Sequence, residues 1–215
     1  MILHIETATK VCSVALSNEG KLIAEKSSNT EHYSHAENLN VFIQDILDEA
    51  KISFKDLSAI CVTSGPGSYT GLRVGVSTAK ALCYTLEIPL ISVDSLFSIA
   101  TQLNSKYPGK KISAMIDARR MEVFSAIYDE NLDVIKPISA DIIEESSYEE
   151  YGEFVAAGDG VNKLKEIFKH RKQITLDDTV LSSAIGQIEL AHEKYLRKDF
   201  EDVAYFEPFY LKDFK

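Results

Sequence analysis

The alternation of apolar and polar positions at the start of the chain predicts three strands. Short apolar runs at residues 2–6, 11–16 and 22–26 are separated by polar residues, and Asn18-Glu19-Gly20 supplies a turn. Glycine adopts the positive φ of a tight turn at little steric cost, which is typical of a hairpin. We therefore expect residues 1–28 to form a three-stranded meander.

A helical period follows this meander. Apolar residues recur on one stripe from His35 to Ala50, and Ser34 and Glu37 have the spacing of a capping box at its start. Further elements are expected in the order strand, helix, strand, at residues 59–63, 70–86 and 90–93. Strands that alternate with helices after a meander indicate a mixed α/β sheet.

The same pattern begins again later in the chain. A shift of 111 residues without a gap places Ile5-Glu6 on Ile116-Asp117 and the turn at 18–20 on residues 129–131. A strand at 155–157, a turn at 158–160, a helix at 161–169 and a last helix near 181–196 are then expected. Two copies of a βββαβα plan indicate a duplicated fold. The predicted lobes are residues 1–104 and 105–215.

Composition and charge narrow the function classes. Apolar residues make up 45% of the 215 positions, and no apolar run approaches the ~20 residues that a membrane span needs. The first residues lack the pattern of a signal peptide, and Cys12, Cys61 and Cys83 stand singly in apolar runs, so we expect a cytoplasmic protein without metal or thiol chemistry. The net charge of −10 and the scattered basic residues argue against a chain that binds nucleic acid alone.

The glycine-rich stretch at residues 64–75 has three interpretations. It lacks the lysine of a phosphate-binding P-loop, and it is one residue too long for a dinucleotide fingerprint, in which Pro66 would also remove a backbone donor. It can instead be a tight turn into a helix that packs closely on the sheet. The following helix is also apolar over more than the ~100° stripe that one sheet covers, which favours an interface with a second chain.

Several motifs together resemble the TsaB/TsaD family. The stretch Gly65 to Gly75 is similar to the family signature GPGSFTGxRxG. Residues 5–16 resemble its N-terminal IDTSTxxxSVAL segment, 35–37 its HSE helix start, 117–123 its DARRGEVY segment and 208–211 its terminal PxYLR. These matches occur in the right order over nearly the whole chain, and the length fits the short TsaB (YeaZ) branch.

This resemblance implies the two-lobed actin/Hsp70/sugar-kinase-like (ribonuclease H-like) fold of duplicated βββαβα units. It also implies a non-catalytic subunit that pairs with the catalytic paralogue TsaD and the ATPase TsaE. Together these transfer threonylcarbamoyl to N6 of adenosine 37 in tRNAs that read codons beginning with A. The resemblance further implies a homodimer when TsaD is absent, and contact with tRNA only through the complex.

In that fold, two glycine-containing hairpins hold ATP phosphates. The corresponding hairpins here contain no glycine, and Glu6 replaces the usual aspartate, so we predict no catalytic residue, no cofactor and no metal site. The pair His32 and His35 is one residue closer than the paralogue's HxxxH pair and lacks a third ligand. The degenerate positions of the nucleotide cleft are Glu6, Thr7, Asp117, Arg119, Gly158 and Gly160.

The predicted functional surface is a pair of helices that contacts TsaD. Its candidate residues are Leu39, Phe42, Ile43, Ile46, Leu47, Arg73, Val74, Val76, Ser77, Lys80, Ala81 and Tyr84, with Arg73 and Lys80 as polar contacts. The signature loop beside them comprises Gly65, Pro66, Gly67, Ser68 and Gly71. For each apolar candidate, the alternative is packing against the chain's own sheet.

Two other functions stay open from the sequence. An independent small-molecule kinase or ATPase of the same fold is compatible with Asp117 and the turn at 158–160. A dinucleotide-binding enzyme would use the loop at Gly65, with Asp94 at the end of the next strand.

Overall fold

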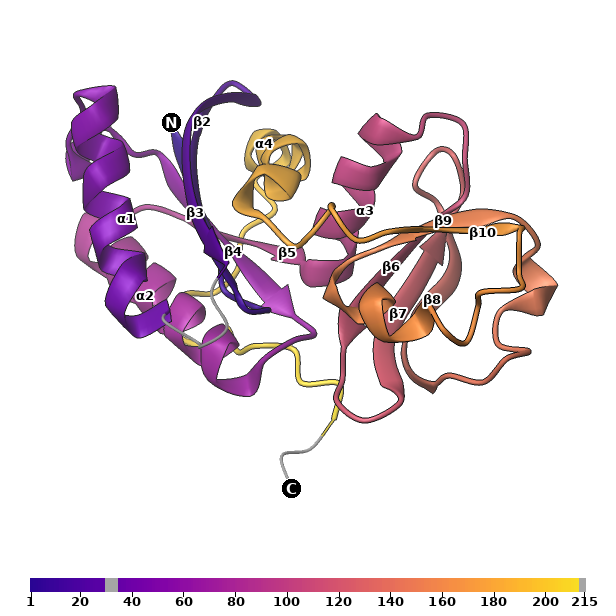
Figure 1. The fold of residues 1–215 in the computed structure, drawn as a ribbon. Helices are drawn as coiled ribbons and strands as arrows, with labels where there is room; N and C mark the ends of the chain where they lie inside the picture. Colours follow the sequence, from indigo (N-terminus) through magenta and orange to yellow (C-terminus); the bar gives the residue numbers. More distant parts are fainter. Residues whose placement is uncertain (30–34, 213–215) are drawn as a thin grey trace.

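Two five-stranded sheets with the same strand order form the framework of this computed structural model, which describes residues 1–29 and 35–212 (Figure 1). The first has the order β3-β2-β1-β4-β5, with strands β1 Ile2–Glu6, β2 Val11–Asn18, β3 Lys21–Asn29, β4 Ala59–Gly65 and β5 Leu90–Asp94. The second has the corresponding order β8-β7-β6-β9-β10, with β6 Ile112–Asp117, β7 Glu122–Tyr128, β8 Val134–Ile142, β9 Phe154–Ala157 and β10 Ile174–Asp177. The predicted repeat of the meander is confirmed.

The two meanders differ by one residue in register. Glu6 lies opposite Ser13 in the first sheet, whereas Asp117 lies opposite Val123 in the second. The second hairpin is therefore one residue tighter than the ungapped shift of 111 predicts. Its turn contains Arg119 and Arg120 with φ of 68° and 49°, the left-handed region that tight hairpins require.

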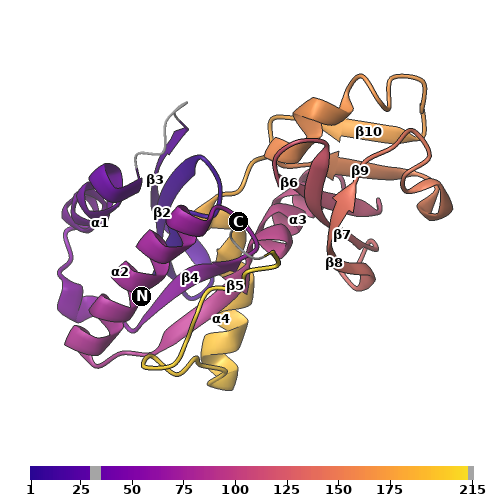
Figure 2. The same cartoon turned by 90° about the horizontal axis from the view of Figure 1, so that it is seen from below.

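Helices cover both faces of the first sheet. Their bounds are α1 His35–Ala50, α2 Tyr69–Leu86, α3 Ser95–Lys106 and α4 Ile188–Arg197, and the short 3-10 turns are η1 Phe54–Asp56, η2 Glu149–Tyr151, η3 Asp159–Leu164 and η4 Ala184–Gln187. Figure 2 shows this sheet between α1 and α2 on one side and α4 on the other. The predicted α1 and α2 are confirmed, although Ser34 of the predicted capping box lies outside the described residues. No helix among the described residues is long and apolar enough to cross a membrane.

The second copy of the plan is less helical than predicted. The expected helix at 161–169 is only the 3-10 turn η3, which still buries Val161 and Leu164 in the core of the second lobe. The Lys163 ammonium bonds two carbonyls and a carboxylate of the neighbouring hairpin. These tertiary contacts determine the backbone conformation of this segment. The last helix begins at Ile188, later than predicted, because the hydroxyl of Ser183 accepts from the Ile185 amide in the preceding η4 turn.

The chain also crosses between the lobes more often than a division at residues 104 and 105 implies. Helix α3, which the sequence analysis did not predict, is capped by Asp94 and packs against the core of the second sheet. The chain later returns to the first lobe, where Ala191 of α4 packs against β1, β4 and β5. Each lobe is thus completed by a segment from outside its predicted range.

Candidate functional site

The Glu6 carboxylate bonds a backbone amide within its own hairpin, between β1 and β2. We call a hairpin closed when its own carboxylate takes up an amide in this way. The buried Glu6 accepts a hydrogen bond from the Ala8 amide at 2.6 Å and another from the Thr63 hydroxyl at 2.5 Å. The Gln187 amide donates to the same Thr63 hydroxyl at 2.7 Å. Burial raises the pKa of Glu6 above its ordinary value, despite these hydrogen bonds. The Glu6 side chain is fully buried, and its carboxylate is turned into the protein.

The hairpin between β6 and β7 is closed in the same way, at the position related by the 111-residue shift. Asp117 accepts from the Arg119 amide at 2.7 Å and from the Lys163 ammonium at 2.6 Å. The same ammonium donates to the carbonyls of Arg120 and Glu122 at 3.0 and 2.5 Å. Phosphate-binding hairpins need unoccupied amides, and here the Ala8 and Arg119 amides are already bonded to the carboxylates of Glu6 and Asp117.

The signature glycines allow the first hairpin to lie directly against α2. A Cβ atom on Gly67 would lie 2.3 Å from the Ala8 carbonyl oxygen, and one on Gly71 would lie 2.1 Å from that of Thr7. The Ser68 amide donates to the Ala8 carbonyl at 2.6 Å, and the Thr7 hydroxyl donates to the Gly71 carbonyl at 2.8 Å. These contacts support the interpretation of this loop as a tight turn into a closely packed helix.

The second lobe repeats this arrangement. Gly158 has a φ of 109°, and a Cβ atom there would lie 2.1 Å from the Met115 carbonyl oxygen. Asp159 accepts from the Asp117 amide at 2.9 Å, and burial raises the pKa of Asp159 above its ordinary value. The turn at 158–160, like the signature loop, lies against the end of the first strand of its meander.

The helix residues predicted to contact a partner divide into three groups, which are buried residues, residues on the outward side, and two basic residues bonded within the chain. Leu39, Ile43, Ile46, Leu47 and Val76 lie in the hydrophobic core of the first lobe and are not available to a partner in this conformation. This corrects their assignment as contact residues, because the stripe that helical spacing revealed is the one that packs on the sheet.

The outward side of α2 is formed by other candidates. Val74, Ser77, Ala81 and Tyr84 share one stripe at helical spacing, and all four are exposed or half-buried. The Tyr84 side chain is 82% exposed. On α1, Phe42 is half-buried, and Val41, which the sequence analysis missed, is 55% exposed. The sequence did hold a signal for this exposure, because Val41 is an apolar residue outside the buried stripe of α1.

The predicted polar contacts Arg73 and Lys80 are engaged within the chain. Lys80 donates to the carbonyls of Ala204 and Phe206 at 3.1 and 2.8 Å. The guanidinium of Arg73 lies 4.0 Å from the centre of the Tyr69 ring, and its Nε donates to the Tyr210 hydroxyl at 3.1 Å. Both residues therefore hold the C-terminal segment against α2.

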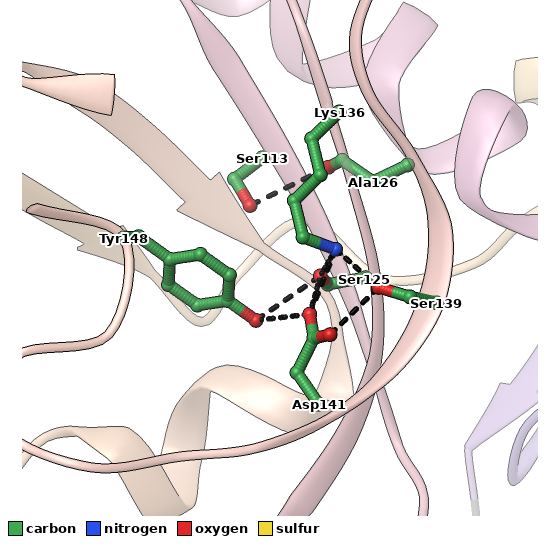
Figure 3. A network of polar contacts seen from close by, with 7 residues as sticks. All are labelled: Ser113, Ser125, Ala126, Lys136, Ser139, Asp141 and Tyr148. Atoms are coloured by element: carbon green, nitrogen blue, oxygen red, sulfur yellow. Dashed lines mark hydrogen bonds and ion pairs between the residues drawn. The ribbon is translucent and has the colours of Figure 1, made fainter. Parts of the chain in front are cut away.

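A polar network in the second lobe was not predicted (Figure 3). Asp141 pairs with Lys136 at 2.8 Å and accepts from the hydroxyls of Ser125 and Tyr148 at 2.6 and 2.7 Å. Burial opposes the charged form, but the hydrogen bonds from Lys136 and its neighbours lower the pKa of Asp141 below its ordinary value. Ser125 is fully buried and its hydroxyl donates to Asp141, so it is not placed as an exposed nucleophile would be.

The histidines and cysteines singled out in the sequence can be placed where the structure describes them. In the described part of the chain, no cluster of three His, Cys, Asp or Glu side chains is arranged to hold a metal ion. Buried His35 bonds the Thr9 carbonyl at 2.8 Å, whereas His32 lies outside the described residues. Burial raises the pKa of the Cys12 and Cys83 thiols to about 11 and about 12, as expected of unreactive buried cysteines.

Comparison with known proteins identifies the family. The model of the family TsaD, tRNA N6-adenosine threonylcarbamoyltransferase, matches residues 30–215. The TsaB protein of Escherichia coli, named for tRNA threonylcarbamoyladenosine biosynthesis, is 31% identical over 99% of this chain and 94% of its own length. The chain belongs to the TsaB family. This TsaB chain also superimposes on YeaZ from Pseudomonas aeruginosa with a TM-score of 0.80, at 26% identity over 98% of this chain and 99% of the other.

A more distant likeness concerns the fold alone. The activator of 2-hydroxyisocaproyl-CoA dehydratase from Clostridium difficile, a structure with bound ADPNP, matches with a TM-score of 0.55 and 9% identity. It covers 94% of this TsaB chain and 98% of its own chain. The predicted α/β fold is thus confirmed, as is the resemblance to TsaB.

Proposed function

We propose that this TsaB chain is a non-catalytic subunit that binds and activates the catalytic paralogue TsaD. In that complex, threonylcarbamoyl is transferred to N6 of adenosine 37 of tRNA. The observation that carries the non-catalytic role is the closure of both hairpins by Glu6 and Asp117, which take up the amides of Ala8 and Arg119. A chain of this fold without phosphate-binding hairpins acts through its surface.

The proposed contact surface is the outward side of α1 and α2, defined by Val41, Phe42, Val74, Ala81 and Tyr84. Exposed aromatic residues contribute large contact areas at low entropic cost, and Tyr84 is 82% exposed. The same surface would form the homodimer when TsaD is absent. With a net charge of −10, the chain contributes little to tRNA affinity, so tRNA binding belongs to the complex. We also propose that TsaE is a partner of this chain. The complex would act in the cytoplasm.

The test is co-purification of TsaD with surface variants. Tyr84→Glu places a charge in the proposed contact, and we expect it to lower recovery of TsaD by about tenfold or more. Val76→Glu is unsuitable, because Val76 is 3% exposed in the core and its replacement would unfold the lobe.

Val134→Glu is the matched control, because it places the same charge on an apolar side chain of β8 that is 62% exposed. It should retain normal recovery of TsaD. Undiminished pairing of the Tyr84→Glu protein would contradict the assignment of the surface.

A further inference from the structure

The C-terminal residues begin by attaching to the edge of the first sheet. After α4 ends, the Glu201 amide donates to the Leu90 carbonyl at 2.9 Å, which adds an antiparallel bridge to β5. The Glu201 carboxylate accepts from the Ser92 hydroxyl at 2.5 Å. Each contact joins residues that are far apart in sequence. Together they fix the direction in which the chain continues after α4.

The segment then runs along α2, as Figures 1 and 2 show in yellow. Val203 and Phe206 pack against the core of the first lobe. The ammonium of Lys80 bonds the carbonyls of Ala204 and Phe206. Residues 203–205 form a turn in which the Phe206 amide donates to the Asp202 carbonyl at 2.8 Å. Lys80 holds this turn against α2 by satisfying two backbone carbonyls.

The signature loop provides the next attachment. The Phe209 amide donates to the Ser64 carbonyl at 2.7 Å. Gly65 has a φ of 118°, and a Cβ atom there would lie 2.5 Å from the Phe209 carbonyl oxygen. Tyr210 follows, with its ring centre 4.8 Å from that of Tyr69 and its hydroxyl bonded to Arg73. Gly65 and Arg73 of the signature thus form the seat of the C-terminal segment.

The segment ends on the second lobe. Leu211 packs against the core that α3 shares with the second sheet, and Lys212 forms an ion pair with Glu122 at the start of β7, beside the second hairpin. The two covalent connections between the lobes meet elsewhere, where Ser98 and Thr101 of α3 bond the carbonyls of Ser183 and Gly186 at 3.0 and 2.8 Å. The C-terminal segment is therefore a third, non-covalent link between the lobes.

We propose that residues 201–212 form a strap that holds the two lobes at a fixed spacing, with the signature residues Gly65 and Arg73 and with Lys80 as its seat. The covalent connections by themselves form a hinge, because both pass through the contact between α3 and η4. The strap joins the signature loop to the second hairpin and so restrains rotation about that hinge. It acts within one chain and does not depend on the proposed partner.

The test measures the distance between the lobes in the full-length chain without a partner. Spin labels at Lys21→Cys, the exposed first residue of β3, and at Glu130→Cys, an exposed turn position of the second lobe, report this distance by electron–electron double resonance. The native cysteines are at most 2% exposed and do not take up label. The release variant combines Lys80→Met with Tyr210→Ala, and we expect its distance distribution to broaden and shift to longer values.

Hydrogen exchange at the Phe209 amide reports whether the strap is seated. In the release variant this amide should exchange at least roughly tenfold faster, because three hydrogen bonds are lost, two from Lys80 and one from Arg73 to Tyr210. Tyr205→Ala is the matched control on the same segment, because that side chain is 84% exposed, and it should change neither readout.

Three outcomes would overturn the proposal. The first is an unprotected Phe209 amide in the wild-type chain. The second is a release variant in which this amide stays as protected as in the wild type. The third is a variant in which the amide is exposed but the distance distribution is unchanged.

Discussion

His4 carries a buried imidazole in the middle of β1. Its Nε2 pairs with the Ser17 hydroxyl at 2.7 Å, and within the described residues Nδ1 has no hydrogen-bond partner. Burial lowers the pKa of His4 from 6.5 to about 3. Below pH 6.5 the unfolded chain therefore binds a proton that the folded chain does not. The free energy of unfolding must fall as the pH is lowered from about 6.5 toward about 3.

We predict that this group alone removes about 2 kcal/mol of stability between pH 7.5 and pH 5, at up to about 1.4 kcal/mol per pH unit. His4→Gln should flatten the pH dependence of the urea midpoint, followed by circular dichroism. The comparison cancels the opposite effect of Glu6, whose raised pKa favours the folded state at lower pH. His170→Gln, which changes an exposed imidazole, should leave the slope unchanged. Equal slopes in the wild type and His4→Gln would contradict the prediction.

At the scale of elements, the contact between α2 and the first hairpin depends on glycine. Alanine normally favours a helix over glycine by about 1 kcal/mol. At Gly71 the added methyl would meet the backbone oxygen of Thr7 at 2.1 Å, and backbone atoms cannot move aside as a flexible side chain can. Steric overlap therefore outweighs propensity at this position.

We predict that Gly71→Ala lowers the free energy of unfolding by about 2–3 kcal/mol, as overpacked sites do. Urea denaturation measures the loss. The control is Gly109→Ala, where an added Cβ has no heavy atom within 4 Å and only the left-handed φ of 77° is strained. That variant should lose about 1 kcal/mol. A Gly71→Ala protein as stable as the wild type would show that the helix is not held against the hairpin.

At the scale of the whole molecule, the two lobes carry equivalent hairpins that are both closed. Glu6 and Asp117 are related by the duplication, and each bonds the amide two residues further along. In an ATPase of this fold both hairpins must hold phosphate together. Because both hairpins are bonded internally, we expect nucleotide binding to be weakened in both lobes at once.

We accordingly predict that the isolated chain neither binds Mg-ATP at micromolar concentrations nor hydrolyses it, measured by titration calorimetry and phosphate release. The physical reason is that binding must first break the turn bonds of both carboxylates and displace Lys163. A variant that removes this ammonium, Lys163→Met, opens only the second hairpin and should also fail to bind. Micromolar binding with turnover would favour the independent kinase or ATPase.

The sequence by itself determined the strands of both meanders, the helices α1 and α2, the duplication and the family. These features depend on local chemistry. Hydrophobic spacing and turn residues act over a few positions, and the glycines of residues 65–75 are irreplaceable wherever backbones touch. Sequence reasoning therefore found both the helices of the proposed surface and the loop beside them.

Only the tertiary structure decided which side of those helices is available and what the polar residues contact. Helical spacing identified the stripe with Leu39 and Ile43, but not that the chain's own sheet covers it. Lys80 contacts carbonyls more than 120 positions away, and Lys163 closes a hairpin 46 positions before it. Such contacts leave no periodic pattern in the sequence, because the fold determines which distant backbone groups come within hydrogen-bonding distance of a side chain.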